Sequence, residues 1–99
     1  DNTTRFMVIG DKLIVNKEHN RIMVAFSTYN RSGDLSSVLG EISKDGINML
    51  SIKSRPLKDS PWEYIFFVEL EGNYNILKDA IKEIEKKTNY FEVIGSYEK

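Results

Sequence analysis

Two amphipathic helical segments, each enclosed by stretches with strand periodicity, constrain the fold of this chain more than any other feature. The first segment has apolar residues at positions i, i+3, i+4 and i+7, the spacing that gives a helix one apolar face. These residues are Leu35, Val38, Leu39 and Ile42. A similar stripe in the second segment consists of Leu77, Ala80, Ile81 and Ile84. Strands are predicted at Arg21–Ser27, Ile47–Arg55, Trp62–Leu70 and Phe91–Tyr97. The element order is therefore βαββαβ.

This order predicts an α+β fold, the ferredoxin-like βαββαβ sandwich. Because both crossovers are right-handed, both helices should lie on one face of a four-stranded antiparallel sheet. If Tyr64, Phe66 and Val68 point at the helices, then Ile65 and Phe67 point at the opposite face. That face is too apolar to remain in water, so we expect a second copy or a preceding domain to cover it.

The chain begins with a segment that differs in character from the rest. Residues Asn2–Ile9 are β-prone, and Asp11–Asn20 combine turn formers with charges, as a connector does. We therefore interpret residues 1–19 as the tail of a preceding domain with its linker. Residues 20–99 are predicted to form the domain itself.

Capping and turn residues suggest where the elements end. Ser32 or Asp34 is placed to cap the first helix, and Gly46 to end it in a left-handed turn. Pro56 has no amide hydrogen for a ladder and is expected to close the second strand. Residues Leu57–Pro61 are then predicted to be a polar loop.

Composition narrows the classes of function. With 99 residues, 40% of them hydrophobic, the chain can bury one core. A formal net charge of −1 gives no global field for phosphate backbones or anionic lipids, so we expect neither nucleic acid nor membrane as a partner. The chain has no cysteine, which fits the cytoplasm as the default compartment.

The sequence offers no candidate residues for catalysis or for metal binding. His19 is the only histidine, and it has neither cysteine nor a spaced carboxylate beside it, so a metal site is disfavoured. No nucleophile accompanies it, and a solvated histidine in the linker is the favoured interpretation. We therefore expect no metal, no cofactor and no catalytic residue in this chain.

The turn before the first helix could bind an amino acid. At Ser32 and Gly33 the first helical amides would be free to meet a carboxylate, and glycine allows close approach. On the following strand Asn48 offers a donor and an acceptor, and Met49 and Leu50 could line an apolar slot. The same residues are also routine turn chemistry, which the local pattern by itself favours.

At these residues the sequence resembles the ACT domain, specifically the regulatory domain of prephenate dehydratases. The stretch SGDLSSVL at Ser32–Leu39 is similar to the family's Gly-Ala-Leu loop and helix. GINMLSIKSRP at Gly46–Pro56 is similar to its Gly-Ile-Asn-Leu strand, which ends in Glu-Ser-Arg-Pro. WEYIFFVELEG at Trp62–Gly72 is similar to its aromatic strand. Aromatic amino acid hydroxylases share the Ser-Arg-Pro element, so the tail decides between the two families.

In that tail Asn2, Thr4, Arg5 and Phe6 match the Asn-x-Thr-Arg-Phe element that ends the catalytic domain of prephenate dehydratases. The resemblance thus implies that Thr4, Arg5 and Phe6 are remnants of an active site that lies in the parent chain. It implies a parent lyase, or a fusion with chorismate mutase, with its catalytic domain in cis.

The resemblance also implies feedback control by L-phenylalanine, bound between two ACT domains of a homodimer or larger assembly. A first set of residues would face the ligand from one subunit: Ser32, Gly33, Asp34 and Leu35. A second set would face it from the other: Asn48, Met49 and Leu50. The motif residues Ser54, Arg55 and Pro56 would support the site.

Two departures from the family pattern keep alternatives open. Asp34 replaces the usual Ala, and Lys53 replaces the Glu before Ser54, which reverses a charge near the motif. One alternative is a domain that only dimerises, its ligand site having decayed, and another is a domain that senses a different amino acid. A nucleic-acid-binding module rests on topology and aromatic residues alone, since the glycines of that signature are missing.

Overall fold

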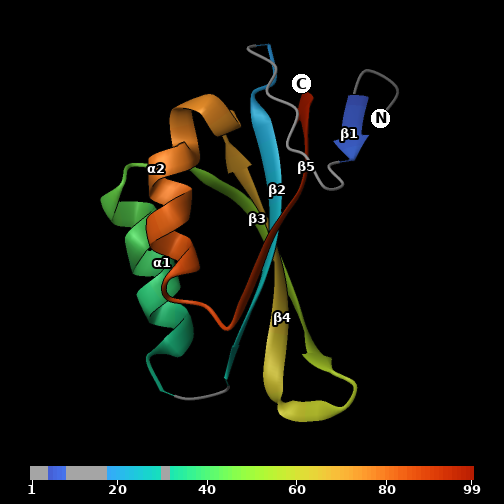
Figure 1. Ribbon diagram of the computed structural model, residues 1–99, viewed down its shortest axis with the longest axis vertical. Helices are drawn as coiled ribbons and strands as arrows, with labels where there is room; N and C mark the ends of the chain where they lie inside the picture. The colour runs from blue at the N-terminus through green and yellow to red at the C-terminus, as the bar shows by residue number, and fades with distance from the viewer. Residues whose placement is uncertain (1–4, 9–17, 30–31) are drawn as a thin grey trace.

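The chain folds into one antiparallel sheet with two helices on one of its faces (Figure 1). The computed structural model describes the backbone of residues 5–8, 18–29 and 32–99, and the side chains of residues 18–29, 32–60 and 62–99. The elements are β1 Arg5–Val8, β2 Arg21–Tyr29, α1 Asp34–Lys44, β3 Met49–Leu57, β4 Ser60–Glu71, α2 Tyr74–Glu85 and β5 Tyr90–Glu98. Their order from β2 onward confirms the predicted ferredoxin-like fold.

The strands lie in the order β1-β5-β2-β4-β3. The four strands of the βαββαβ unit have the predicted antiparallel arrangement, and β1 is added beside β5 as a fifth strand, with Met7 opposite Ser96. Residues 5–8 of the predicted tail are thus part of this sheet, whereas Thr4 lies outside the described residues. A domain boundary at residue 19 stays a prediction.

The core lies between the sheet and the helices because alternate residues of the central strands face the same way. From β2 and β4 it contains Ile22, Val24, Phe26, Phe66, Val68 and Leu70; from the helices, Val38, Ile42, Leu77, Ile81 and Ile84. Phe26 and Phe66 stack with ring centroids 5.3 Å apart. The helical stripes read from the sequence are therefore the buried faces. Among the described residues, neither helix is long and apolar enough to cross a membrane.

The β3–β4 connection is tighter than the sequence suggested. The predicted loop at Leu57–Pro61 is wrong, because β3 continues to Leu57, β4 begins at Ser60, and Leu57 pairs with Ser60. Pro56 also lies inside β3, opposite Tyr64, instead of ending the strand. Since β3 is an edge strand of the sheet, its proline can direct the missing amide away from the ladder.

Helix caps differ in kind between α1 and α2. Neither Ser32 nor Asp34 is the N-cap of α1: the cap is Gly33, in the left-handed conformation with φ +88°, and no side chain among the described residues bonds to it. Gly46 follows the helix with φ +72°, as predicted. In α2 the N-cap is Asn73, whose side chain accepts a hydrogen bond from the Ile76 amide at 3.0 Å.

His19 corrects another expectation. It is buried, with 6% of its surface exposed, rather than solvated in a linker. Its Nδ1 lies 2.6 Å from Oγ of Ser96, which is also buried. The misreading arose because β5 closes against residues just before β2, a contact between segments 77 positions apart in the chain.

Replacing glycine with alanine should change the free energy of unfolding in opposite directions at Gly72 and at Gly40. A Cβ at Gly72 would lie 2.9 Å from Cδ1 of the core residue Leu77, at φ +134°, whereas one at Gly40 on α1 would meet nothing within 4 Å. We expect Gly72→Ala to lower the free energy of unfolding by about 1–3 kcal/mol. Gly40→Ala, the matched control, should raise it by about 0.5–1 kcal/mol, because alanine favours a helix. Urea denaturation measures both, and a neutral Gly72→Ala would contradict the expected clash.

Candidate functional site

The Gly33 turn presents the amino end of α1 to solvent. Gly33 and Ser32 are exposed, and Asp34 and Leu35 are half-buried, Leu35 packing against the core. The first amides of a helix have no partner within it, and they stand at the positive end of the helix dipole. With a glycine cap that brings no side chain, this turn can receive a small carboxylate.

The second set of predicted residues lies beyond the other end of α1. Ile47 donates its amide to the carbonyl of Ile42 at 3.1 Å, which turns the chain from the helix into β3. Asn48 and Leu50 are exposed, and Leu50 shows 39% of its surface, whereas Met49 packs against the core. This segment therefore offers one polar side chain beside an apolar surface.

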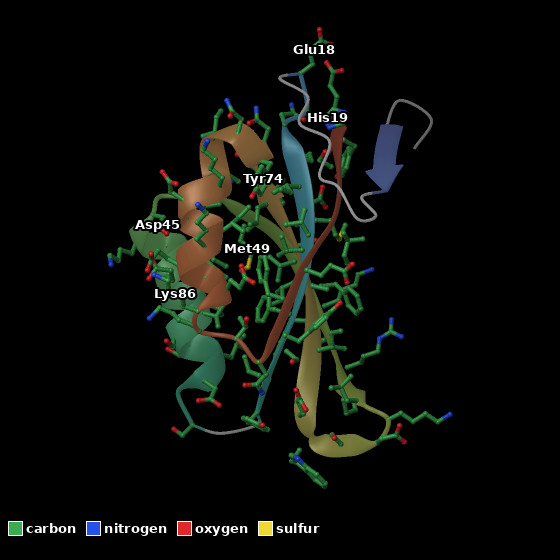
Figure 2. The ribbon with its side chains drawn as sticks, viewed as in Figure 1. Glu18, His19, Asp45, Met49, Tyr74 and Lys86 are labelled. Atoms are coloured by element: carbon green, nitrogen blue, oxygen red, sulfur yellow. The ribbon has the colours of Figure 1, made fainter. Side chains whose placement is uncertain are left out.

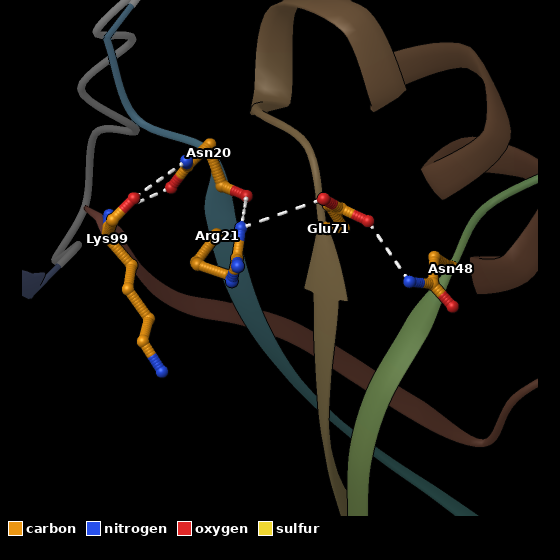
Figure 3. Close-up of polar contacts among 5 residues, drawn as sticks. All are labelled: Asn20, Arg21, Asn48, Glu71 and Lys99. Carbon is orange, nitrogen blue, oxygen red and sulfur yellow. Dashed lines mark hydrogen bonds and ion pairs between the residues drawn. The ribbon is translucent and has the colours of Figure 1, made fainter.

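Asn48 is held by a polar network that crosses the end of the sheet (Figure 3). Its Nδ2 donates to Oε1 of Glu71 at 3.0 Å, and its carbonyl accepts from the Glu71 amide at 2.9 Å. The other carboxylate oxygen of Glu71 lies 4.0 Å from Nη1 of Arg21, which donates to the carbonyl of Asn20 at 2.9 Å. The Asn20 side chain binds both backbone groups of Lys99, at 2.9 and 3.0 Å. The Asn48 Nδ2 is thus engaged within the chain, whereas no described residue is seen to bond to its Oδ1.

The network is held by hydrogen bonds more than by charge. The side chains of Arg21 and Glu71 are 18% and 51% exposed, and their atoms reach only the limit of an ion pair. A pair so open to solvent contributes about 0–1 kcal/mol. The ion pair therefore adds little to stability, and it is the hydrogen bond from Asn48 to Glu71 that fixes the orientation of the Asn48 side chain.

One copy of the chain cannot bring the two sets of residues together. Gly33 precedes α1 and Asn48 follows it; α1 has 11 residues, so its ends lie about 16 Å apart at about 1.5 Å per residue. In Figure 1 the two loops are at opposite ends of the helix. A second copy running in the opposite direction beside the first would place the Gly33 turn of each near Asn48 of the other.

The motif residues Ser54, Arg55 and Pro56 occupy the half of β3 nearer the Gly33 turn. Ser54 pairs with the core residue Phe66, which places it on the helix side of the sheet. Arg55 faces the other way, and its guanidinium carbon lies 5.4 Å from the centre of the Phe67 ring. All three are exposed. Only Ser54 and Pro56 therefore share the face on which α1 lies.

Sequence reasoning missed Glu71 and Arg21, the residues that hold Asn48. Glu71 follows the aromatic strand and, by spacing alone, is a routine polar residue before a glycine. Its contact with Asn48 depends on the register of β3 and β4, which shifts between Met49 and Ser51. A register assigned from the predicted strand ends would have placed Asn48 opposite Glu69, because the observed pairing of Met49 with Leu70 differs from it by two residues.

No group of residues in the described part of the chain has the arrangement of a metal site. The polar groups at both ends of α1 are amides, hydroxyls and single carboxylates. These groups suit a ligand with its own carboxylate and ammonium groups. They offer no nucleophile and base in contact.

Comparison with curated sequences finds relatives along the whole chain. It is 38% identical over 101 residues to a bifunctional chorismate mutase/prephenate dehydratase of Aquifex aeolicus, which covers 100% of this chain and 28% of that protein. It is 30% identical over 100 residues to a prephenate dehydratase of Methanocaldococcus jannaschii, covering 98% of this chain and 37% of that protein. The chain therefore spans about a third of the length of these relatives. No family model matches the sequence.

Solved structures show the same fold. A prephenate dehydratase from Staphylococcus aureus superposes with a TM-score of 0.69 and 29% identity, over 82% of this chain and 31% of that one. A prephenate dehydratase from Arthrobacter aurescens in complex with L-Phe gives a TM-score of 0.76 at 20% identity, over 91% and 30%. The ACT domain of a GTP pyrophosphokinase from Chlorobium tepidum gives 0.61 at 16%, over 77% and 99%.

These comparisons agree with the motifs read from the sequence. The relatives that match along the whole chain are prephenate dehydratases, and a domain matched over 99% of its own length is an ACT domain. This chain is similar along its whole length to part of these prephenate dehydratases, and its fold is that of an ACT domain.

Proposed function

We propose that the chain is the regulatory domain of a prephenate dehydratase and binds L-phenylalanine between two copies of itself, so that the end product controls the enzyme. The main support is that the two candidate loops lie at opposite ends of α1, so that one copy cannot form the whole binding site. The relatives are prephenate dehydratases by name, and the similar structure from Arthrobacter aurescens is a complex with L-Phe. The parent would be a cytoplasmic lyase.

The edge of the sheet offers a way to bring two copies together. Among the described strands, β3 has a neighbour on one side only, and Leu50 and Ile52 are exposed along it. An unpaired edge is a template for another strand. Two β3 strands in antiparallel contact would continue the sheet and set α1 of each copy beside β3 of the other.

The residues then take complementary roles toward a zwitterion. The carboxylate of the ligand would meet the first amides of α1, which begin at Asp34, beside the Ser32–Gly33 turn of one copy. The ammonium group would bind Oδ1 of Asn48 in the other copy, or the Asp34 carboxylate. Leu35, Met49 and Leu50 would enclose the aromatic side chain, and Ser54 and Pro56 would support the turn.

Lys53 argues against a decayed site. Its position opposite Phe67 places it on the face without helices, away from the Gly33 turn and Asn48. The reversed charge of the motif is therefore outside the proposed pocket. Asp34 remains the one departure within it, at the start of a helix, where a carboxylate interacts favourably with the dipole.

The ligand can regulate the enzyme if it binds one arrangement of the two copies more tightly than another. The equilibrium between the arrangements then shifts by the difference in binding free energy. The network from Asn48 through Glu71 and Arg21 to Asn20 supports a connection, since Asn20 lies where the predicted linker joins the domain. We assign residues 1–19 to the end of the catalytic domain and its linker, with Thr4, Arg5 and Phe6 as remnants of its active site.

Binding of L-phenylalanine tests the proposal directly. A ligand at about 100 times its Kd should raise the free energy of unfolding by about 2.7 kcal/mol, because it binds only the folded state. We expect this rise in thermal melting. Asn48→Ala should weaken binding in calorimetry about tenfold or more, since it removes the Oδ1 acceptor. Asn75→Ala, at an exposed position of α2, is the matched control. A chain that melts identically with and without phenylalanine would refute the ligand assignment.

Mixed variants test whether the site is shared. Gly33→Asn keeps the left-handed turn, which asparagine tolerates, but places a side chain where the carboxylate would approach. Each of Gly33→Asn and Asn48→Ala should bind poorly alone. After unfolding and refolding together, random pairing should restore about a quarter of the sites, because half of the chains form hybrids with one intact site of two. No recovery would mean that each chain supplies both sets of residues.

We expect Glu71 to affect the affinity for phenylalanine only through its hydrogen bond with Asn48. We expect Glu71→Ala to weaken phenylalanine binding several-fold, because Asn48 loses the acceptor that orients it. Glu71→Gln keeps an acceptor oxygen and should restore most of the affinity. In the Asn48→Ala background, Glu71→Ala should have no further effect in calorimetry; additive losses would exclude a role through Asn48.

A further inference from the structure

The face of the sheet without helices has side chains arranged in rows across the strands. One row runs Lys53, Phe67, Ala25 and Glu92 from β3 to β5, and the next runs Arg55, Ile65, Ser27 and Tyr90. No described helix covers this face (Figure 1). In Figure 2 many side chains project from it on the side away from α1 and α2.

Charge is distributed unevenly along these rows. On the β3 side are two cations, Lys53 and Arg55, both exposed. They border a groove of about 330 Å³ whose other walls are Met23, Ser51, Phe67 and Glu69. At the β5 end of the same row is Glu92, to which the Tyr90 hydroxyl donates a hydrogen bond. This bond, with burial and the nearby charge, raises the pKa of Tyr90, so the tyrosine stays a donor to the carboxylate.

Side-chain size is distributed unevenly as well. In the two rows β4 carries the large residues Phe67 and Ile65, and β2 carries the small residues Ala25 and Ser27 opposite them. A half turn about an axis parallel to the strands, midway between β2 and β4, exchanges β2 with β4 and β3 with β5. The large residues then lie over the small ones, and Lys53 lies over Glu92.

We propose that this face binds the same face of a second copy, related by that two-fold axis. Glu92 of each copy would enter the groove beside Lys53 and Arg55 of the other, and Phe67 of each would pack over Ala25. Such a contact is self-complementary in both charge and shape, as an isologous interface requires. It is separate from the proposed edge contact through β3, and the two together would give a tetramer.

The area is sufficient for such an interface. Four strands about 4.8 Å apart and about 30 Å long present roughly 550 Å² on each partner, or about 1,100 Å² in total. Specific interfaces begin near about 1,000 Å². When two sheets pack in the aligned manner, their strand directions stay within about 30° of each other. Each row of one copy then lies opposite the same row of the other copy.

Charge reversal tests the proposal on the 99-residue chain by sedimentation at increasing concentration. Glu92→Lys should weaken self-association about tenfold or more, and Lys53→Glu should do the same. Because β5 and β3 lie on opposite sides of the β2–β4 pair, Glu92→Lys leaves the edge contact unaltered. The double variant exchanges the two charges and should recover association to within about threefold of the original.

The control is Glu85→Lys, an exposed carboxylate on α2 that makes the same change in net charge. It should leave association unchanged. A Glu92→Lys chain that associates normally, or a double variant that stays weak, would overturn the proposal. So would reversals that affect only a longer chain carrying the preceding domain, since that domain would then cover the face.

Disulfide trapping gives a second readout, since the chain has no native cysteine. Chains with Lys53→Cys mixed with chains with Glu92→Cys should form a mixed disulfide dimer on oxidation, whereas Glu92→Cys alone should form little. Lys53→Cys alone reports on the edge contact through β3. Absence of the mixed product, with folded chains by circular dichroism, would contradict stacking of the two faces.

Discussion

The pairing of β2 with β4 is the interaction on which the rest of this structure depends. Along this pair the large buried side chains of one face meet both helices, and the same backbone sets the rows of the other face. Burying side chains such as Phe26 and Leu70 contributes roughly 1.5–3 kcal/mol each. The pair therefore fixes the sheet register, and the register determines which residues each surface offers.

Loop placement follows from the same arrangement. Since α1 joins β2 to the edge strand β3, its two flanking turns must lie at opposite ends of the layer. A binding site that uses both turns is then a property of two chains, and its occupancy depends on how they are arranged. This constraint ties ligand recognition to assembly without any catalytic group.

The sequence predicted the strands, both helices and the buried stripes because periodicity reports directly on which residues face the core. It failed where a feature depends on contacts between distant segments. Pro56 continues a strand because that strand is at an edge, and His19 is buried because β5 closes over it. The Gly33 and Asn48 loops could be named from motifs, but the bond from Asn48 to Glu71 needed a register that shifts beside it. Whether these residues bind a ligand stays a prediction.

The double hydrogen bond between the Asn20 side chain and Lys99 joins the residue before β2 to the residue after β5. A folded unit with adjoining ends can be spliced into a surface loop of another protein without stretching its host. The host loop only has to span the short gap across the two strands. This geometry would allow the unit from β2 to β5 to be inserted into such a loop.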